Sequence, residues 1–212
     1  MKDIPVFTTV HGAASLVLRE IPHSHQAYIR LQATQEPEAM LADCVNFCRD
    51  CGAERISASG HPYLERFPLV TAVVEMKRSL EELPQTDALL LPVLPETVES
   101  WLELYNTRMA HVPNAAFLSR ADGCAMLQKG DGYFVHRDGK LLGIGRASGG
   151  TIDALAAVEP GAGRDVLLAL CSALSEDTAE LTVATANLPA VRLYEALGFL
   201  TVREISRWYR VV

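Results

Sequence analysis

Long hydrophobic runs are missing from this sequence. No uninterrupted apolar stretch approaches the 18 residues that suggest a membrane-spanning helix, and Met1 to Pro5 lack the apolar stretch of a secretory signal. A basic excess is also missing, because 26 acidic side chains outnumber 19 Lys and Arg side chains and give a net charge of −7. We therefore expect no membrane partner, no nucleic-acid partner and a cytoplasmic location.

Cysteine is scarce and odd in number, with five residues that lack the dense, even spacing of a secreted disulfide scaffold. Cys44, Cys48 and Cys51 have the spacing of the iron–sulfur site of radical S-adenosylmethionine enzymes. Steps of three and four residues, however, place them on one face of a predicted helix, where burial explains them without a cluster. The other metal candidates are loop histidines of the kind typical of polar surface: His23, His25 and His61. We predict no metal site.

Hydrophobic residues make up 49% of the chain, enough for a buried core in one large domain or two small ones. Apolar periodicity and turn residues predict the elements of the C-terminal part. Its helices are expected at Pro95–His111, from Ser119, at Asp165–Leu174 and at Pro189–Leu197, and its strands at Tyr133–His136, Leu141–Ile144, Thr151–Val158, Leu181–Ala184 and Thr201–Val211. Asp138-Gly139 is a strong hairpin signal between the first two strands. Gly123 is expected to interrupt the helix that starts near Ser119.

The N-terminal part has a related order of elements. Its strands are expected at Ser15–Ile21, Ala27–Gln32, Arg55–Ala58 and Leu69–Lys77, with a helix at Pro37–Cys51 and a short helix at His61–Phe67. The order strand, helix, strand, short helix, strand recurs from Thr151 to Val211, and Tyr63–Phe67 echoes Leu193–Leu197. We therefore predict an internal duplication, with domains at 1–85 and 86–212.

A glycine-containing turn links a predicted strand to a predicted helix in the second half. Gly161-Ala162-Gly163-Arg164 follows Pro160. A helix N-terminus presents unpaired N–H groups and partial positive charge, glycines let a phosphate approach the backbone, and Arg164 can add charge-assisted hydrogen bonds. By itself, the pattern fits a plain strand-to-helix turn equally well.

Three segments together resemble the GCN5-related N-acetyltransferase (GNAT) superfamily. They are the hairpin at Asp138-Gly139, the strand, turn and helix at Thr151–Leu174, and the segment Asn187–Phe199, which matches the family pattern Asn…Ala…Leu-Tyr-Glu…Leu-Gly-Phe almost throughout. The resemblance covers the chain from about Leu89 to Val212. It implies an α/β fold with a mixed, mostly antiparallel sheet flanked by helices, and transfer of an acetyl group from acetyl-CoA to an amine without a metal.

The resemblance also implies a coenzyme A site. Carbonyls of the cofactor-side strand pair with the pantetheine arm in this family, and the following turn binds the pyrophosphate. Asn187 either contacts the pantetheine or only caps its helix. The predicted cofactor-binding residues are Ala156, Ala157, Val158, Gly161, Ala162, Gly163, Arg164, Asp165, Asn187 and Tyr194.

Tyr194 is the predicted catalytic acid, because the departing thiolate needs a proton donor and the family's matching Tyr supplies it. A half-buried aromatic side chain with a structural role is the alternative. Asp153 and Glu159 are the candidate general bases, although carboxylates at strand ends are also typical of solvated surface. The expected acceptor is a small-molecule or peptide amine, and the expected assembly is a monomer or homodimer.

Two departures from the family pattern keep a second function open. The turn between Pro160 and Arg164 is shorter than the family's usual loop. In the N-terminal half, the turn at Thr34–Pro37 has no glycine, and Leu64 stands where Tyr194 stands in the second half. The N-terminal half is therefore interpreted as a unit without a cofactor. A non-catalytic GNAT-fold protein that binds a ligand or partner is the alternative function.

Overall fold

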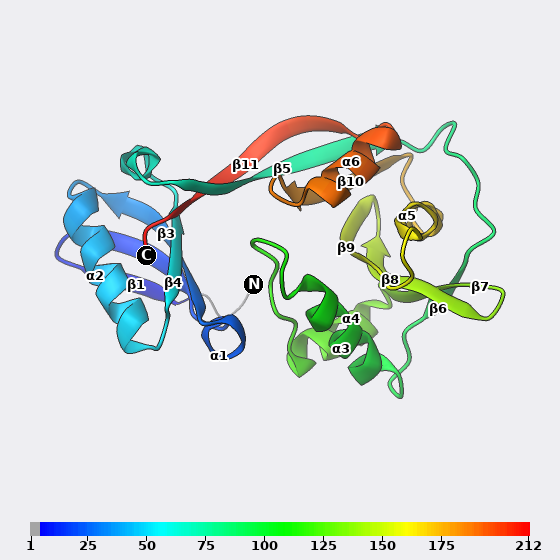
Figure 1. The fold of residues 1–212 in the computed structure, drawn as a ribbon, viewed down its shortest axis with the longest axis horizontal. Helices are drawn as coiled ribbons and strands as arrows, with labels where there is room; N and C mark the ends of the chain where they lie inside the picture. The colour runs from blue at the N-terminus through cyan, green and yellow to red at the C-terminus, as the bar shows by residue number, and fades with distance from the viewer. Residues whose placement is uncertain (1–4) are drawn as a thin grey trace. The chain divides into compact units, whose positions relative to one another are not determined.

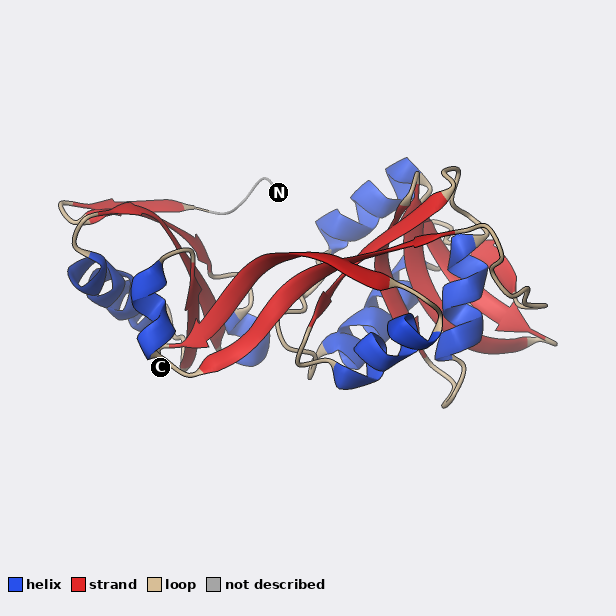
Figure 2. Cartoon of the chain, turned by 90° about the horizontal axis from the view of Figure 1, so that it is seen from above, coloured by secondary structure: helices blue, strands red, loops and turns tan. Residues whose placement is uncertain are grey.

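The computed structural model describes residues 5–212, and their contacts separate the chain into two compact units. Unit 1 contains the residues up to Val73 together with Glu204–Val212, and unit 2 contains Val74–Arg203. This division differs from the predicted boundary between residues 85 and 86, because two long strands each contribute residues to both units (Figure 2). These neighbouring strands are β5 (Leu69–Ser79) and β11 (Leu200–Arg210).

Unit 1 is a small sheet with a helix packed on it (Figure 1). Its remaining elements are β1 (Val6–Thr9), β2 (Gly12–Val17), α1 (Ile21–Ser24), β3 (Gln26–Thr34), α2 (Pro37–Asp50), β4 (Arg55–Ser59) and the 3-10 helix η1 (Pro62–Arg66). The first three strands pair antiparallel, whereas α2 connects β3 to β4, which pair in parallel. The end of β11 lies antiparallel beside β4, where Tyr209 pairs with Ala58.

Unit 2 contains the larger number of helices and the other strands. They are β6 (Leu89–Pro92), α3 (Val98–Met109), α4 (Arg120–Lys129), β7 (Gly132–Arg137), β8 (Lys140–Ser148), β9 (Thr151–Ala157), α5 (Gly163–Cys171), β10 (Thr178–Ala184) and α6 (Leu188–Ala196). Strands β6 to β9 pair antiparallel, and α5 connects β9 to the parallel strand β10. Asp138 and Gly139 both have positive φ and form the predicted tight turn between β7 and β8.

The connection through α5 in unit 2 repeats the connection through α2 in unit 1. In each unit an antiparallel pair leads into a helix, then a parallel strand, then a short helix and a long strand. The repeated order fits the predicted duplication, and the duplication itself stays a prediction.

Helices of unit 2 cover both faces of its sheet. Gly143 and Gly145 face α5, because a Cβ at these positions would lie 2.6 Å from Val166 and 2.3 Å from Leu170. Ile144, between them on β8, belongs instead to the cluster that contains Trp101 of α3. Since successive strand residues point to opposite faces, α5 and α3 pack on opposite sides of β8.

Several elements differ from the sequence-based expectation. The short strands β1 and β6 and the helix α1 were not predicted. Gly123 does not interrupt a helix; it is buried inside α4, where a Cβ would lie 2.8 Å from Leu102 of α3. Glycine there permits close packing of α3 and α4. Ser119 and Asp122 form the capping box that starts α4.

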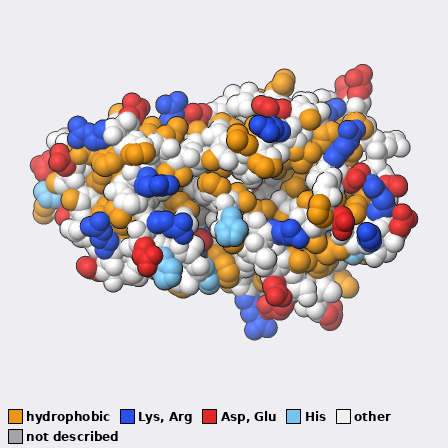
Figure 3. Space-filling view, in the orientation of Figure 1, with side chains coloured by type: hydrophobic (Ala, Val, Ile, Leu, Met, Phe, Trp, Pro, Cys, Tyr) orange, Lys and Arg blue, Asp and Glu red, His pale blue; other side chains and the backbone are white. Residues whose placement is uncertain are grey.

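The surface charges and the helix lengths are the features that concern the nucleic-acid and membrane partners, both of which the sequence predicts to be absent. Acidic and basic side chains are interspersed on the face seen in Figure 3. Within residues 5–212, no helix combines the length and the apolar character needed to cross a membrane.

The contact between β8 and α5 predicts a large effect of adding volume at Gly145. We expect Gly145→Val to lower the free energy of unfolding by about 1–3 kcal/mol, because its side chain would overlap Leu170. Ser148→Val, at an exposed position of the same strand, is the control and should change stability by less than about 0.5 kcal/mol. Urea denaturation measures both; equal stability of the two variants would contradict the packing described.

Candidate functional site

The parallel pairing of β9 with β10 stops early. The register contains only the pairs Thr151–Glu180 and Ile152–Leu181. From Ala154 to Ala157, β9 continues to pair with β8 on its other side but has no partner in β10 among the described residues. Backbone groups on this open edge can therefore pair with an extended ligand. Ala156 and Ala157, two of the predicted cofactor-binding residues, lie in this stretch.

The turn after β9 ends at the N-terminus of α5. Gly161 has φ +82°, and Ala162 is the N-cap residue without a side-chain cap. Within the described part of the chain, the N–H groups of Gly161, Gly163, Arg164 and Asp165 donate to no other residue. Free N–H groups at a helix N-terminus form a site for an anion such as a phosphate.

The charged side chains of this turn differ in their partners. Asp165 accepts from Arg137 at 2.6 Å and from Thr86 at 3.1 Å. The hydrogen bond with Asp165 is the main cause that raises the pKa of Arg137. The Asp165 carboxylate is thus paired with a cation, which reduces its repulsion of an anion. Arg164 is exposed, so its guanidinium is accessible to an anion beside the free N–H groups.

The carbonyl of Val158 is already engaged. Arg108, in the last turn of α3, donates to it from Nη2 at 2.8 Å. The N–H groups of Val158 and Glu159 both donate to the carbonyl of Leu142. In the chain without ligand the Val158 carbonyl thus already accepts one hydrogen bond from a side chain distant in the sequence, and its contact with pantetheine stays a prediction.

Asn187 is the N-cap of α6, and its Oδ1 accepts from the N–H of Ala190 at 3.4 Å. Of the two interpretations of this residue, the structure shows the helix cap. Contact with pantetheine stays a prediction.

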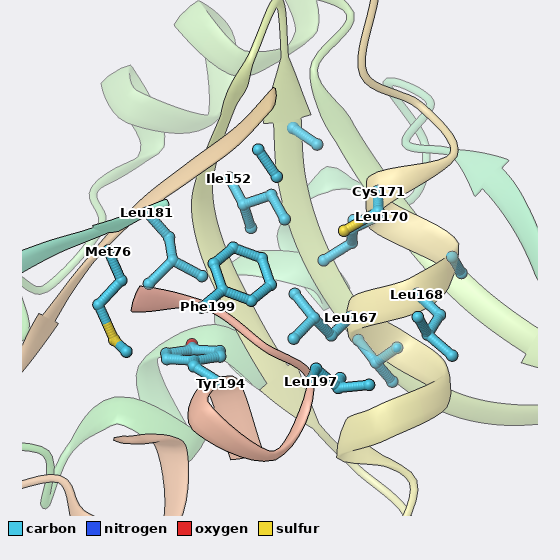
Figure 4. Close-up of a cluster of buried hydrophobic side chains, with 14 of the residues drawn as sticks. Met76, Ile152, Leu167, Leu168, Leu170, Cys171, Leu181, Tyr194, Leu197 and Phe199 are labelled. Carbon is cyan, nitrogen blue, oxygen red and sulfur yellow. The ribbon is translucent and has the colours of Figure 1, made fainter. Parts of the chain in front are cut away.

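Tyr194 lies in the interior of unit 2. Its side chain is surrounded by Phe199, Leu181 and Met76 (Figure 4), with the Tyr194 and Phe199 ring centroids 5.9 Å apart. Only 8% of the residue is exposed. Burial raises the pKa of its phenol to about 12, so the hydroxyl stays protonated at neutral pH and can donate a hydrogen bond or a proton.

The start of α5 and the helix that holds Tyr194 lie together. A Cβ at Gly163 would be 3.2 Å from Leu193, the neighbour of Tyr194 in α6. Val166 of α5 and Tyr194 also belong to the same buried cluster. The structure thus brings Gly163, at the start of α5, close to α6.

The two candidate bases are both exposed. Asp153 lies in β9 where the register with β8 shifts, so the strand has a bulge at this residue. Its charge contributes to the raised pKa of Arg146: burial lowers that pKa, but the hydrogen bond and charge of Asp131 outweigh burial. Glu159 begins the turn, and its carbonyl accepts from Ala162 at 3.2 Å. A catalytic role for either carboxylate stays a prediction.

Arg146 and Asp131 form a buried ion pair that the sequence analysis missed. Their atoms Nη2 and Oδ2 are 2.7 Å apart, and Nε and Oδ1 are 3.2 Å apart. The Asp131 side chain is fully buried. This two-point contact ties Asp131, between α4 and β7, to β8, beside the bulge at Asp153.

The cysteines do not share one environment. Cys44 and Cys48 are buried in α2, and burial raises their pKa values to about 12 and about 11. Cys51 is exposed at the end of the helix, so the expectation that all three face inward is wrong for Cys51. His61 caps η1 by accepting from Tyr63. Residues 5–212 contain no group of three or more potential metal ligands.

Comparisons with known proteins place this geometry in a fold family. No protein-family model and no curated protein sequence matches the chain. Among solved structures, a GCN5-related N-acetyltransferase from Sphaerobacter thermophilus is similar over 93% of this chain and 75% of its own, with a TM-score of 0.55 and 14% identity. Another from Anabaena variabilis is similar over 94% of this chain and 59% of its own, with a TM-score of 0.62 and 10% identity.

A conserved protein of unknown function from Staphylococcus epidermidis is similar over 98% of this chain and 93% of its own, with a TM-score of 0.62 and 13% identity. At these identities the similarity shows the fold and not the activity. The chain has the α/β fold of the GCN5-related N-acetyltransferases, which confirms the predicted fold class.

Proposed function

We propose that this protein transfers an acetyl group from acetyl-CoA to an amine acceptor. One observation carries the proposal: the unpaired edge of β9 leads directly into the free N–H groups at the start of α5. An extended arm with amide groups can pair along the strand edge, and a pyrophosphate at its end can bind the N–H groups of Gly161, Gly163 and Arg164. Acetyl-CoA has an amide-containing arm and a pyrophosphate in this order.

The proposed reaction is direct attack on the thioester. The amine nitrogen forms a bond to the acetyl carbon, and the bond from that carbon to sulfur breaks. The Tyr194 hydroxyl gives its proton to the departing thiolate, and the proton lost by the amine goes to water or to Asp153 or Glu159. The Tyr194 phenol is neutral throughout the physiological range and so carries the proton to be donated, while burial, which raises its pKa, makes it a weaker acid than a phenol in water.

Several features of the proposal rest on chemistry alone. The acceptor is proposed to be a small-molecule or peptide amine, and the excess of acidic side chains favours a cationic one. No metal takes part in the proposed reaction. The alternative is a protein that binds a ligand or partner without catalysis, which the short turn between Pro160 and Arg164 favours.

Cofactor binding can be tested by thermal shift. We expect coenzyme A to stabilise the chain by RT ln(1 + [L]/Kd), about 2.7 kcal/mol at a hundredfold excess over Kd. Gly163→Asp should abolish this stabilisation, because a carboxylate would stand beside the N–H groups proposed to bind phosphate. Ser175→Asp adds the same charge at an exposed position beyond the other end of α5 and should retain it. A full shift in Gly163→Asp would place the cofactor elsewhere.

The role of Tyr194 can be tested by removing its hydroxyl. In Tyr194→Phe we expect kcat to fall by roughly 10²–10⁴-fold, the usual contribution of a positioned acid. The Kd for coenzyme A should hardly change, because the lost interaction acts in the transition state. Tyr209→Phe removes a hydroxyl from another buried tyrosine, in unit 1, and should keep full activity.

The pH profile adds a second readout. A proton donor is lost when pH rises through its pKa, and the pKa of Tyr194 is about 12. No loss of activity between pH 8 and 10 should therefore arise from this phenol, and Tyr194→Phe should have the wild-type profile there at a lower rate.

Full activity of Tyr194→Phe would make Tyr194 structural. Wild-type protein that binds coenzyme A but acetylates no polyamine, aminoglycoside, amino acid or peptide N-terminus would favour the non-catalytic alternative.

A further inference from the structure

We propose that Arg108 is a cofactor-binding residue whose guanidinium binds the pyrophosphate of coenzyme A, an inference that rests on the proposed function. Arg108 belongs to α3, but its Nη2 atom lies 2.8 Å from the carbonyl oxygen of Val158, at the end of β9. Val158 is followed by Glu159, Pro160 and then Gly161, the first residue with a free N–H group. The guanidinium thus stands where the strand edge meets the proposed phosphate site.

The present partner of Arg108 is a weak one. A neutral carbonyl accepts one of five N–H donors, and the side chain is exposed, so water screens the interaction. A phosphate group carries charge and can accept two donors of the guanidinium at once, which makes a stronger bond. Exchange of the carbonyl for the pyrophosphate is therefore favourable. It also frees the Val158 carbonyl to pair with the pantetheine arm.

The turn itself supplies little positive charge for a pyrophosphate, and Arg108 can add to it. The short turn offers few N–H donors and holds two carboxylates: Asp165 is already paired with Arg137, whereas Glu159 is exposed and adds a negative charge that a cation can balance. Arg164 supplies a cation from the turn itself, and Arg108 supplies a second cation from the opposite face of the sheet, where α3 lies. A structural role is the competing explanation, because a cation in the last turn of α3 also stabilises the helix dipole.

Four variants separate the two explanations, with the Kd for coenzyme A measured by calorimetry on the full chain. Arg108→Met removes both the charge and the hydrogen bond. Arg108→Gln keeps a donor for the Val158 carbonyl without the charge, and Arg108→Lys keeps the charge. Arg120→Met, the control, removes an exposed cation of α4 that pairs with Glu99.

We expect Arg108→Met and Arg108→Gln to weaken binding by about 10- to 100-fold, the effect of one charge-assisted hydrogen bond. Arg108→Lys should recover most of the affinity, Arg120→Met should bind as the wild type does, and the loss should shrink at high salt. Wild-type affinity in Arg108→Gln, or a loss that salt does not change, would make Arg108 structural and overturn the inference alone. Absence of binding by the wild-type chain would overturn the proposed function as well.

Discussion

The early end of the pairing between β9 and β10 is the constraint on which the proposed site depends. A parallel pair that continued to the end of β9 would fill the strand edge with backbone hydrogen bonds and leave no place for a ligand's amides. β10 is held on its other side by β5, its neighbour in the sheet. Nζ of Lys77 in β5 lies 2.5 Å from the Glu180 carboxylate, and the N–H of Leu80 donates to the backbone carbonyl of Asp177 at 2.8 Å. β10 can therefore leave β9 without losing its place in the sheet.

In unit 1 a helix also connects two parallel strands, but those strands stay paired. Its parallel strands β3 and β4 pair without interruption through five residue pairs, from Gln26–Arg55 to Arg30–Ser59. Its helix α2 begins at Pro37, which has no N–H group, after Glu36, whose carboxylate contacts His11 at 2.6 Å. An anion would meet a negative charge there. These contacts support a cofactor site in unit 2 alone, as proposed from the turn sequence.

The sequence was most informative where periodicity and turn chemistry agree. The hairpin at Asp138-Gly139, the helix at Pro37 and the glycine turn before α5 were all predicted from local residues, and the resemblance predicted the fold. Contacts between distant residues left no local signal. Arg108 lies 50 residues before Val158, and the pair of Arg146 with Asp131 joins β8 to the segment between α4 and β7. The division of β5 and β11, each of which contributes residues to both units, likewise depends on strand pairing between distant residues that no local pattern encodes.

Hydrogen–deuterium exchange with and without coenzyme A can show whether coenzyme A binds along β9 and the start of α5, because it reports on backbone N–H groups without any substitution. We expect slower exchange on binding in peptides that cover β9 and the first turn of α5, where the N–H groups of Gly161, Gly163 and Arg164 have no partner within residues 5–212. Peptides of β3 and α2 in unit 1 should not change. Protection confined to unit 1, or no protection at saturating coenzyme A, would contradict this expectation.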